Sequence, residues 1–293
     1  MRHQRVSSLV LGAIPFASLL GVWWLVWYFS IIPRWLLSSP TETWQTFFKL
    51  AQSGQLVKLL ATSFTNATVS FTLALFVALL VGTVVGVNST AKKVFLPFLS
   101  FIYPIPSLAW LPLIIMLFGF SRGSVWIIVG LSAFFRMVFP IINGIRSVNQ
   151  RYLWTAENLG YSKWGKLVKI IYPAALPAIM SGIRVGFGSA WRSLIGAEII
   201  VPLVGGLGSY IAQSQSQFRF DQVFAGVIVI SFVSYAIEKL IFERLEERID
   251  ATESRIYSRL ADLEDKMEGH QQDTNDFFEV VREDIRGLLE IKE

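Results

Sequence analysis

The sequence predicts an all-α, polytopic membrane protein with six transmembrane helices and a C-terminal cytosolic helical extension. Of its 293 residues, 53% are hydrophobic and 16% charged, and the mean hydropathy is +0.53. This composition is too apolar for the surface of a soluble domain. Six apolar runs approach the roughly 20 residues that a helix needs to cross a bilayer core.

The charges divide the chain into two predicted domains. Residues 246–293 contain 15 acidic and 7 basic side chains, which leaves 6 acidic and 19 basic in residues 1–245. A basic, acid-poor body with an acidic end is typical of a membrane protein with a soluble appendage. We therefore expect a transmembrane domain over 1–245 and a cytosolic helical tail over 246–293.

The six apolar runs follow one another with polar connections between them. The first follows a short basic segment, but it is longer than the apolar core of a signal peptide and lacks a small-x-small cleavage site, so we expect a retained helix. Pro104 and Pro106 interrupt the third run. The runs are residues 9–30, 64–87, 94–118, 125–142, 170–201 and 223–241.

Basic residues in the connections predict the orientation, because cytosolic loops carry an excess of Lys and Arg. An N-terminus in the cytosol leaves five basic residues of the connections outside: Arg34, Lys49, Lys58, Arg122 and Arg219. It places a larger set inside: Arg2, Arg5, Lys92, Lys93, Arg146, Arg151, Lys163, Lys166 and Lys169. Both termini and the connection 145–169 are therefore predicted to be cytosolic.

Two connections on the opposite side carry local signals. Within residues 33–56, Pro40 and Thr41 predict a turn that leads into a short helix, with Thr41 as its N-cap. Residues 202–222 are rich in Gly, Ser and Gln. This composition fits a re-entrant or gate segment and fits a plain flexible loop equally well.

The most informative segment is WTAENLGYSKWGKLVKIIYPAALP at residues 154–177. We expect a short helix over 153–159 that ends at Gly160, because glycine adopts the left-handed conformation of a helix end without strain. Pro173 and Pro177 weaken the start of the next run, where a hinge would be useful. The segment fits a rigid lever at the membrane surface; an ordinary interfacial loop before a kinked helix is the alternative.

The spacing from Gly160 to Ile170 to Pro173 resembles the EAA loop of ABC-transporter permeases. Further segments, in order, resemble the nitrate, sulfonate, taurine and bicarbonate branch of binding-protein-dependent permeases, over roughly residues 10–245. These segments are LSSPTETW at 37–44, YPIPSLAWLPL at 103–113, FPIINGIRSV at 139–148, and the pairs Ala190-Trp191 and Ala197-Glu198.

This resemblance implies the architecture of a type I ABC importer permease, with a coupling loop at about 150–169 that docks on an ATPase. Trp154 stands where the family has its namesake acidic residue, and Tyr172 replaces the usual leucine. The residues expected to couple to the ATPase are Trp154, Ala156, Glu157, Gly160, Ile170 and Pro173.

Charged side chains inside the apolar runs are candidates for a translocation path. A charge that faces lipid is costly, so these groups should face protein or water. Arg184 lies 14 residues beyond Ile170, about 21 Å along a helix. Guanidinium groups would help an anion to cross; alternatively, Arg192 would pair with Glu198 or Glu238 and hold helices together. The candidates are Arg136, Arg184, Arg192 and Glu198.

The tail has two predicted amphipathic helices. Ile249, Ile256 and Leu263 recur every seven residues among charged side chains, which is typical of a helix with coiled-coil character. A second helix follows over about 277–288. The tail would form a dimer, pack on an ATPase or bind a regulator; a solvated appendage is the alternative.

The sequence thus predicts the permease subunit of an ATP-driven importer for a small oxyanion (nitrate, bicarbonate, sulfonate or taurine) in the bacterial inner membrane. The resemblance implies several partners: ABC ATPase subunits that bind ATP and Mg, an extracytoplasmic solute-binding protein, a second permease copy and membrane lipid. The alternatives are an ATP-independent channel or carrier, and a membrane scaffold that acts through its tail.

Some classes of chemistry are not expected in this chain. There is no cysteine and no G-x-x-x-x-G-K-[ST] phosphate loop. We therefore expect no cofactor, metal or catalytic residue, and ATP hydrolysis on separate subunits. The basic residues flank apolar runs and do not form a patch, so we expect no nucleic-acid binding.

Overall fold

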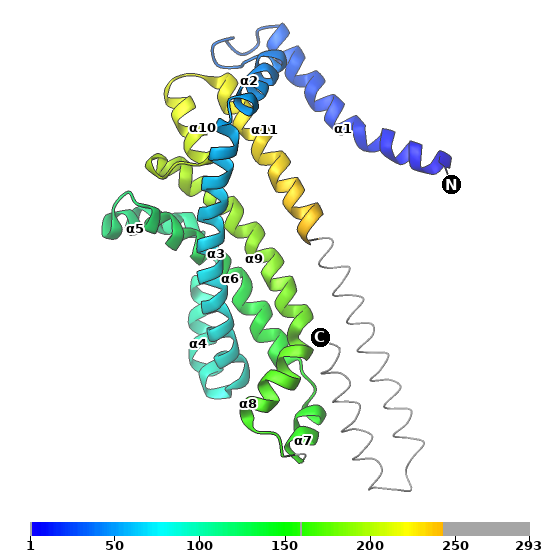
Figure 1. The fold of residues 1–293 in the computed structure, drawn as a ribbon, viewed down its shortest axis with the longest axis vertical. Helices are drawn as coiled ribbons and strands as arrows, with labels where there is room; N and C mark the ends of the chain where they lie inside the picture. Colours follow the sequence, from blue (N-terminus) through cyan, green and yellow to red (C-terminus); the bar gives the residue numbers. More distant parts are fainter. Residues whose placement is uncertain (1, 159, 243–293) are drawn as a thin grey trace. The chain divides into compact units, whose positions relative to one another are not determined.

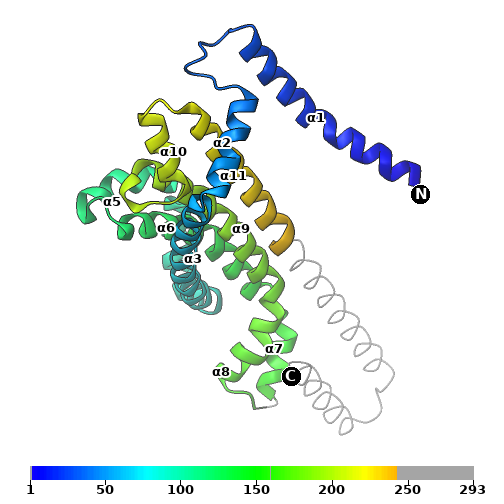
Figure 2. The same cartoon turned by 45° about the horizontal axis from the view of Figure 1, so that its top comes forward.

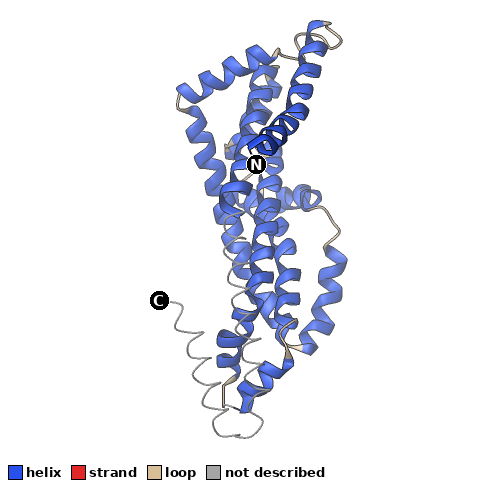
Figure 3. Cartoon of the chain, turned by 90° about the vertical axis from the view of Figure 1, so that its right-hand side faces the viewer, coloured by secondary structure: helices blue, strands red, loops and turns tan. Residues whose placement is uncertain are grey.

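The computed structural model describes residues 2–158 and 160–242, and every regular element in that part of the chain is a helix (Figures 1 and 3). Four helices are long and apolar enough to cross a membrane, and a bent pair makes a fifth span if counted as one. The protein is therefore an all-α, polytopic membrane protein. The four are Gln55–Val87, Arg122–Arg146, Lys163–Ile200 and Phe220–Leu240, and the pair is Ser89–Ile102 with Ser107–Phe118.

The first predicted run corresponds to helix α1 (Arg2–Tyr28). Its described apolar part, Ile14–Tyr28, is shorter than the four long spans. The indole Nε1 of Trp23 donates a hydrogen bond of 3.1 Å to the carbonyl of Ser38, which ties α1 to the connection that follows it. A sixth span stays a prediction that depends on α1. The predicted tail and its boundary at 246 lie outside the described residues.

Helix α2 (Pro40–Gln52) begins two residues earlier than predicted. Its N-cap is Ser39, so the expectation that Thr41 caps the helix is wrong. The Ser39 hydroxyl accepts from the Glu42 N–H at 3.0 Å, and a Glu42 carboxylate oxygen accepts from the Ser39 N–H at 2.9 Å. This reciprocal capping box satisfies two backbone donors, and Pro40 occupies the first helical position, where no N–H is needed.

The second and third runs form helices α3 (Gln55–Val87) and α4 (Ser89–Ile102), the short turn η1 (Ser107–Trp110) and helix α5 (Leu111–Phe118). The third run is not one straight span, because α4 meets the segment Ser107–Phe118 at an angle of 87°. Pro104 and Pro106 stand in the break; proline lacks an N–H and clashes with the preceding turn, so the helix ends before them.

The fourth and fifth runs lie in α6 (Arg122–Arg146) and in a continuous series of α8 (Lys163–Lys166), η2 (Leu167–Ile171) and α9 (Tyr172–Ile200). This fifth span begins seven residues before the predicted residue 170. Ser162 caps it by accepting from the Gly165 N–H at 3.1 Å. The π turn η2 just before Pro173 carries a bond from the Tyr172 N–H to the Leu167 carbonyl. Its wider winding accommodates a proline that would otherwise strain the helix.

Most of the connection 202–222 is helical, which contradicts the alternative of a plain loop. It contains η3 (Pro202–Val204) and α10 (Leu207–Ser216), and it leads into α11 (Phe220–Ile237) and η4 (Glu238–Phe242). Six residues of α10 are buried. A Cβ on Gly226 would lie 2.7 Å from Cγ1 of Ile211, so the glycine lets α10 and α11 approach closely. Helices α2, α10 and α11 lie together in Figure 2.

The chain forms two compact units, each built from three separate stretches. Unit 1 comprises Met1–Phe76, Ile102–Phe134 and Gly186–Ile237. Unit 2 comprises Val77–Phe101, Phe135–Val185 and Glu238–Glu293, the last of which is described to residue 242. In unit 1 the core includes Val129, Leu194 and Leu207, and in unit 2 it includes Met137 and Ile141.

Candidate functional site

The predicted coupling segment forms a short helix before Gly160, and this helix begins three residues earlier than the predicted 153. Helix α7 covers Gln150–Asn158. Gly160 has φ +80°, and its N–H donates to the Glu157 carbonyl while the Tyr161 N–H donates to the Ala156 carbonyl. A side chain at Gly160 would meet nothing within 4 Å. The glycine is therefore required by backbone conformation and not by crowding.

The six predicted coupling residues have different environments within unit 2. Trp154 is 63% exposed, whereas Ala156 is 2% exposed and anchors α7. Glu157 forms an ion pair of 3.2 Å with Lys166, across the turn between α7 and α8. Ile170 and Pro173 are half-buried at the π turn. Helix α7 thus exposes the large side chain of Trp154, while buried Ala156 and the ion pair of Glu157 with Lys166 hold the helix in place.

The four charged candidates for the path belong to two units: Arg136 and Arg184 are in unit 2, and Arg192 and Glu198 are in unit 1. Arg136 and Arg192 are exposed on α6 and α9. In unit 2, Arg184 Nη2 lies 2.5 Å from Glu238 Oε1 and its Nε lies 3.2 Å from the same oxygen. Glu238 thus pairs with Arg184, whereas the alternative left open in the sequence paired Glu198 or Glu238 with Arg192.

Glu198, in unit 1, is 0% exposed and bonds to neutral groups. The Ser63 hydroxyl lies 2.9 and 3.0 Å from its two oxygens, the Asn66 amide donates at 3.4 Å, and the Gly208 N–H donates at 3.0 Å. These partners stand where the alternative left open in the sequence placed Arg192. Such bonds stabilise a carboxylate that would be very costly to bury alone.

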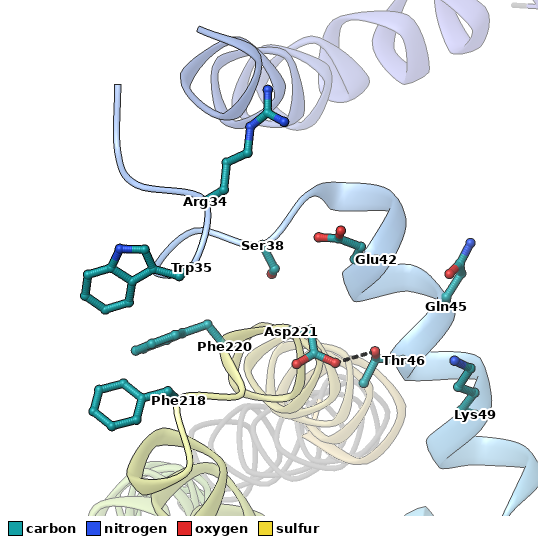
Figure 4. Close-up of a pocket in the computed structure, with 10 residues that line it drawn as sticks. All are labelled: Arg34, Trp35, Ser38, Glu42, Gln45, Thr46, Lys49, Phe218, Phe220 and Asp221. Carbon is teal, nitrogen blue, oxygen red and sulfur yellow. Dashed lines mark hydrogen bonds between the residues drawn. The ribbon is translucent and has the colours of Figure 1, made fainter. Parts of the chain in front are cut away.

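A pocket of about 370 Å³ opens in unit 1, between the residues around α2 and the start of α11 (Figure 4). Thr46 donates to Asp221 at 2.7 Å across it. Trp35 and Phe218 stack edge to face at 6.5 Å, and both side chains are more than half exposed. Phe218 has φ +57°, which is uncommon for a bulky residue. The pocket combines polar walls with an aromatic edge. The remaining lining residues are Arg34, Ser38, Glu42, Gln45, Lys49 and Phe220.

No group of three or more His, Asp or Glu side chains within 2–158 and 160–242 is arranged to hold a metal ion. The polar groups described so far bind one another or face the surface.

Residues 70–251 match the family model described as the binding-protein-dependent transport system inner membrane component. The chain belongs to this family. It is therefore a permease of the ABC transporter class and a protein of the inner membrane.

Named relatives of this permease fall in the branch expected from its sequence. It is 31% identical to the taurine transport system permease protein of Escherichia coli (strain K12) over 80% of this chain and 86% of the relative. It is 30% identical to a Bacillus subtilis (strain 168) permease named for aliphatic sulfonates, over 84% and 87% of the two chains. It is 28% identical to the bicarbonate transport system permease protein of Synechococcus elongatus, over 61% and 64%.

Two features of the permease were missed in its sequence. Ser63 and Asn66 are three apart at the start of the second run and so share one face of α3; polar residues with this spacing in an apolar helix are a usable signal. Gly82 and Gly86 form a small-xxx-small pair, and a Cβ on them would meet Ile141 and Ile145 of α6 at 2.5 and 2.8 Å. That pattern is typical of close helix packing in membranes.

Proposed function

We propose that this permease carries a small oxyanion inward, with sulfonates such as taurine as the first candidates and bicarbonate and nitrate as further members of the class. Two of the most similar relatives are named for taurine and for aliphatic sulfonates. Arg136, Arg184 and Arg192 are proposed to line the path, because guanidinium groups suit an anion. Glu198, which is 0% exposed, is proposed to support the path through its bonds between helices and not to contact the solute. The proposal includes a second permease copy, which completes the path.

The proposed energy source is a pair of ATPase subunits that bind ATP and Mg. The single observation that supports it best is the braced turn of α7 and α8, with Gly160 at φ +80° and Trp154 63% exposed. An exposed aromatic side chain on a rigid helix is suited to insertion into a groove of a partner. The proposed contact set is Trp154, Ala156, Glu157, Gly160, Ile170 and Pro173, with both termini in the cytosol.

The proposed donor of the solute is an extracytoplasmic binding protein. The pocket around α2 and α11 supports this role, because it lies in connections predicted to be outside and carries exposed Trp35 and Phe218. Aromatic side chains are enriched at the centres of protein interfaces.

Reconstituted proteoliposomes test the function. The permease is combined with its ATPase and binding protein, and uptake of radiolabelled taurine, an alkanesulfonate, bicarbonate and nitrate is measured with ATP, without ATP, and with a non-hydrolysable analogue. We expect uptake of one oxyanion class that requires both ATP hydrolysis and the binding protein. Uptake that continues without ATP would instead establish a channel or carrier.

A further inference from the structure

The bonding around Glu198 joins four segments of unit 1. Glu198 is on α9, Ser63 and Asn66 are on α3, and Gly208 is on α10. Trp126 on α6 extends the set, because its indole N–H donates to the Asn66 side-chain oxygen at 3.2 Å. That bond directs the Asn66 amide nitrogen toward Glu198, since an amide has its donor and acceptor on opposite sides.

The start of α10 is held twice by this set. The Gly208 N–H donates to Glu198, and the Leu207 N–H donates to the Ser63 hydroxyl at 2.9 Å. Both are among the first N–H groups of the helix, which have no partner inside the helix. A carboxylate at a helix N-terminus also gains from the helix dipole. These two bonds therefore give partners to the first N–H groups of α10 and fix the point where the helix starts.

Two glycines allow the start of α10 to lie close to α9. A Cβ on Gly206 would collide with the Glu198 carboxylate, and a Cβ on Gly208 would lie 2.5 Å from the Ile195 carbonyl and 2.7 Å from Cβ of Glu198. Gly206 also has φ +99°. Side chains at these positions would push α10 away from α9.

We propose that Glu198 is a positioning residue that fastens the N-terminus of α10 to α3 and α9, and thereby sets the position of the α10–α11 hairpin during transport. Glutamine at this position would turn an amide N–H₂ toward the Asn66 amide nitrogen, which faces Oε1, or toward the Gly208 N–H, which faces Oε2, and both of these groups are donors. At least one bond would be lost although the side chain keeps its shape. The consequence for uptake rests on the proposed function, whereas the position of α10 does not.

The absence of native cysteine allows a direct test of α10 in the full-length protein. A single cysteine at Ser214, which is 2% exposed on α10, reports detachment of this helix through its rate of reaction with N-ethylmaleimide. Cysteine at the exposed Gln217 controls for access of the reagent. Cysteine at Ala175, which is 1% exposed in unit 2, reports general unfolding.

Glu198→Gln and Ser63→Ala should each speed labelling at position 214 about tenfold, the factor that corresponds to loss of one hydrogen bond to a charged group. Ser70→Ala is the matched control for Ser63→Ala. Ser70 is also on α3 and is 1% exposed, but its hydroxyl donates to the Asn66 carbonyl of the same helix and not to Glu198. This control variant should leave the rate unchanged.

The outcomes separate the roles. Unchanged labelling at 214 in both variants would overturn the proposal, and so would an equal rise at position 175, since Glu198 would then support the fold generally. Ser63→Ala and Asn66→Ala serve if Glu198→Gln does not accumulate. In proteoliposomes, faster labelling with a lower maximal uptake rate and unchanged binding-protein affinity supports positioning. If the variants are labelled faster at position 214 but the wild-type permease transports none of the tested oxyanions, the role of Glu198 in holding α10 is supported and the proposed function is wrong.

Discussion

The ion pair of Arg184 with Glu238 lowers the cost of placing a charged residue in a membrane span. Their side chains are 31% and 52% exposed on the single chain, and where water reaches such an ion pair it contributes little to stability, about 0–1 kcal/mol. A charge in hydrocarbon without a partner would cost several times more. The pair therefore makes the arginine tolerable in the span and leaves part of it accessible.

Exchanging the two charges tests whether Arg184 acts on the solute. Arg184→Leu should reduce oxyanion uptake at least tenfold with assembly intact. The double variant Arg184→Glu with Glu238→Arg should keep assembly and still fail to transport, because the positive charge has moved. Uptake and complex recovery are measured in parallel. Full transport by the double variant would show that only the pair matters.

The partners of these residues could not be predicted from the sequence. It identified Arg184, Arg192 and Glu198 as buried or costly charges, and this holds for Glu198. Which groups bond to them depends on which helices are neighbours: Ser63 is 135 residues from Glu198, and Glu238 is 54 from Arg184. Residues 192 and 198, six apart on one helix, point to different faces, so their pairing was unfavourable from the start.

Most helices could be predicted at the scale of elements, because long apolar runs and prolines determine them. α7 and its glycine end were predicted from one helical pattern and Gly160. The cap of α2 was missed although the sequence carries its signal: Ser39 and Glu42 match the S-x-x-E pattern of a capping box, whereas Trp44 stands three residues after Thr41. α10 was missed because its stability comes from burial against Glu198 and Gly226, not from its polar sequence.

The coupling turn is predicted to depend on the conformation of Gly160. Gly160→Val forces a β-branched residue to φ +80°, at a strain of about 1–3 kcal/mol. ATP hydrolysis by the assembled complex should then lose its stimulation by loaded binding protein. Gly54→Val is the matched control, since Gly54 has φ +72° and open space around it but lies in the connection between α2 and α3. Equal effects of the two variants would count against docking at Gly160.

The contact of α3 with α6 in unit 2 is predicted to be sensitive to volume. Gly86→Leu would place a side chain where Cγ2 of Ile145 lies 2.8 Å from a Cβ, and such overpacking costs about 1–3 kcal/mol. Denaturation in mixed micelles should detect this loss. Gly21→Leu on α1, where a Cβ meets nothing within 4 Å, should leave the midpoint unchanged.

For the whole molecule, the acidic tail stays a prediction, because residues 246–293 lie outside the described part of the chain. Its apolar stripes are too narrow for an independent core, and fewer than about 70–80 residues rarely provide one. We expect it to become helical on a basic protein surface, of a second copy or of the ATPase, and to be repelled by anionic lipid.

Truncation at Asp250 tests that role. Transport should persist with an altered turnover rate, and circular dichroism of a 246–293 peptide should show more helix when the purified ATPase is added. Complete loss of transport on truncation would mean that the tail is essential. A peptide that is fully helical alone at low micromolar concentration would contradict docking.

The separation of the groups that bind Glu198 along the chain has a consequence for biogenesis. Ser63 and Asn66 are synthesised 135 and 132 residues before their acceptor, and Gly208 follows ten residues after it. Helix α3 therefore enters the bilayer with polar groups whose final acceptor does not yet exist. A nascent chain stopped before residue 208 holds an incompletely bonded carboxylate in the membrane. We expect such chains to be degraded faster than chains released just beyond α10, which pulse-chase measurement on staged truncations would show.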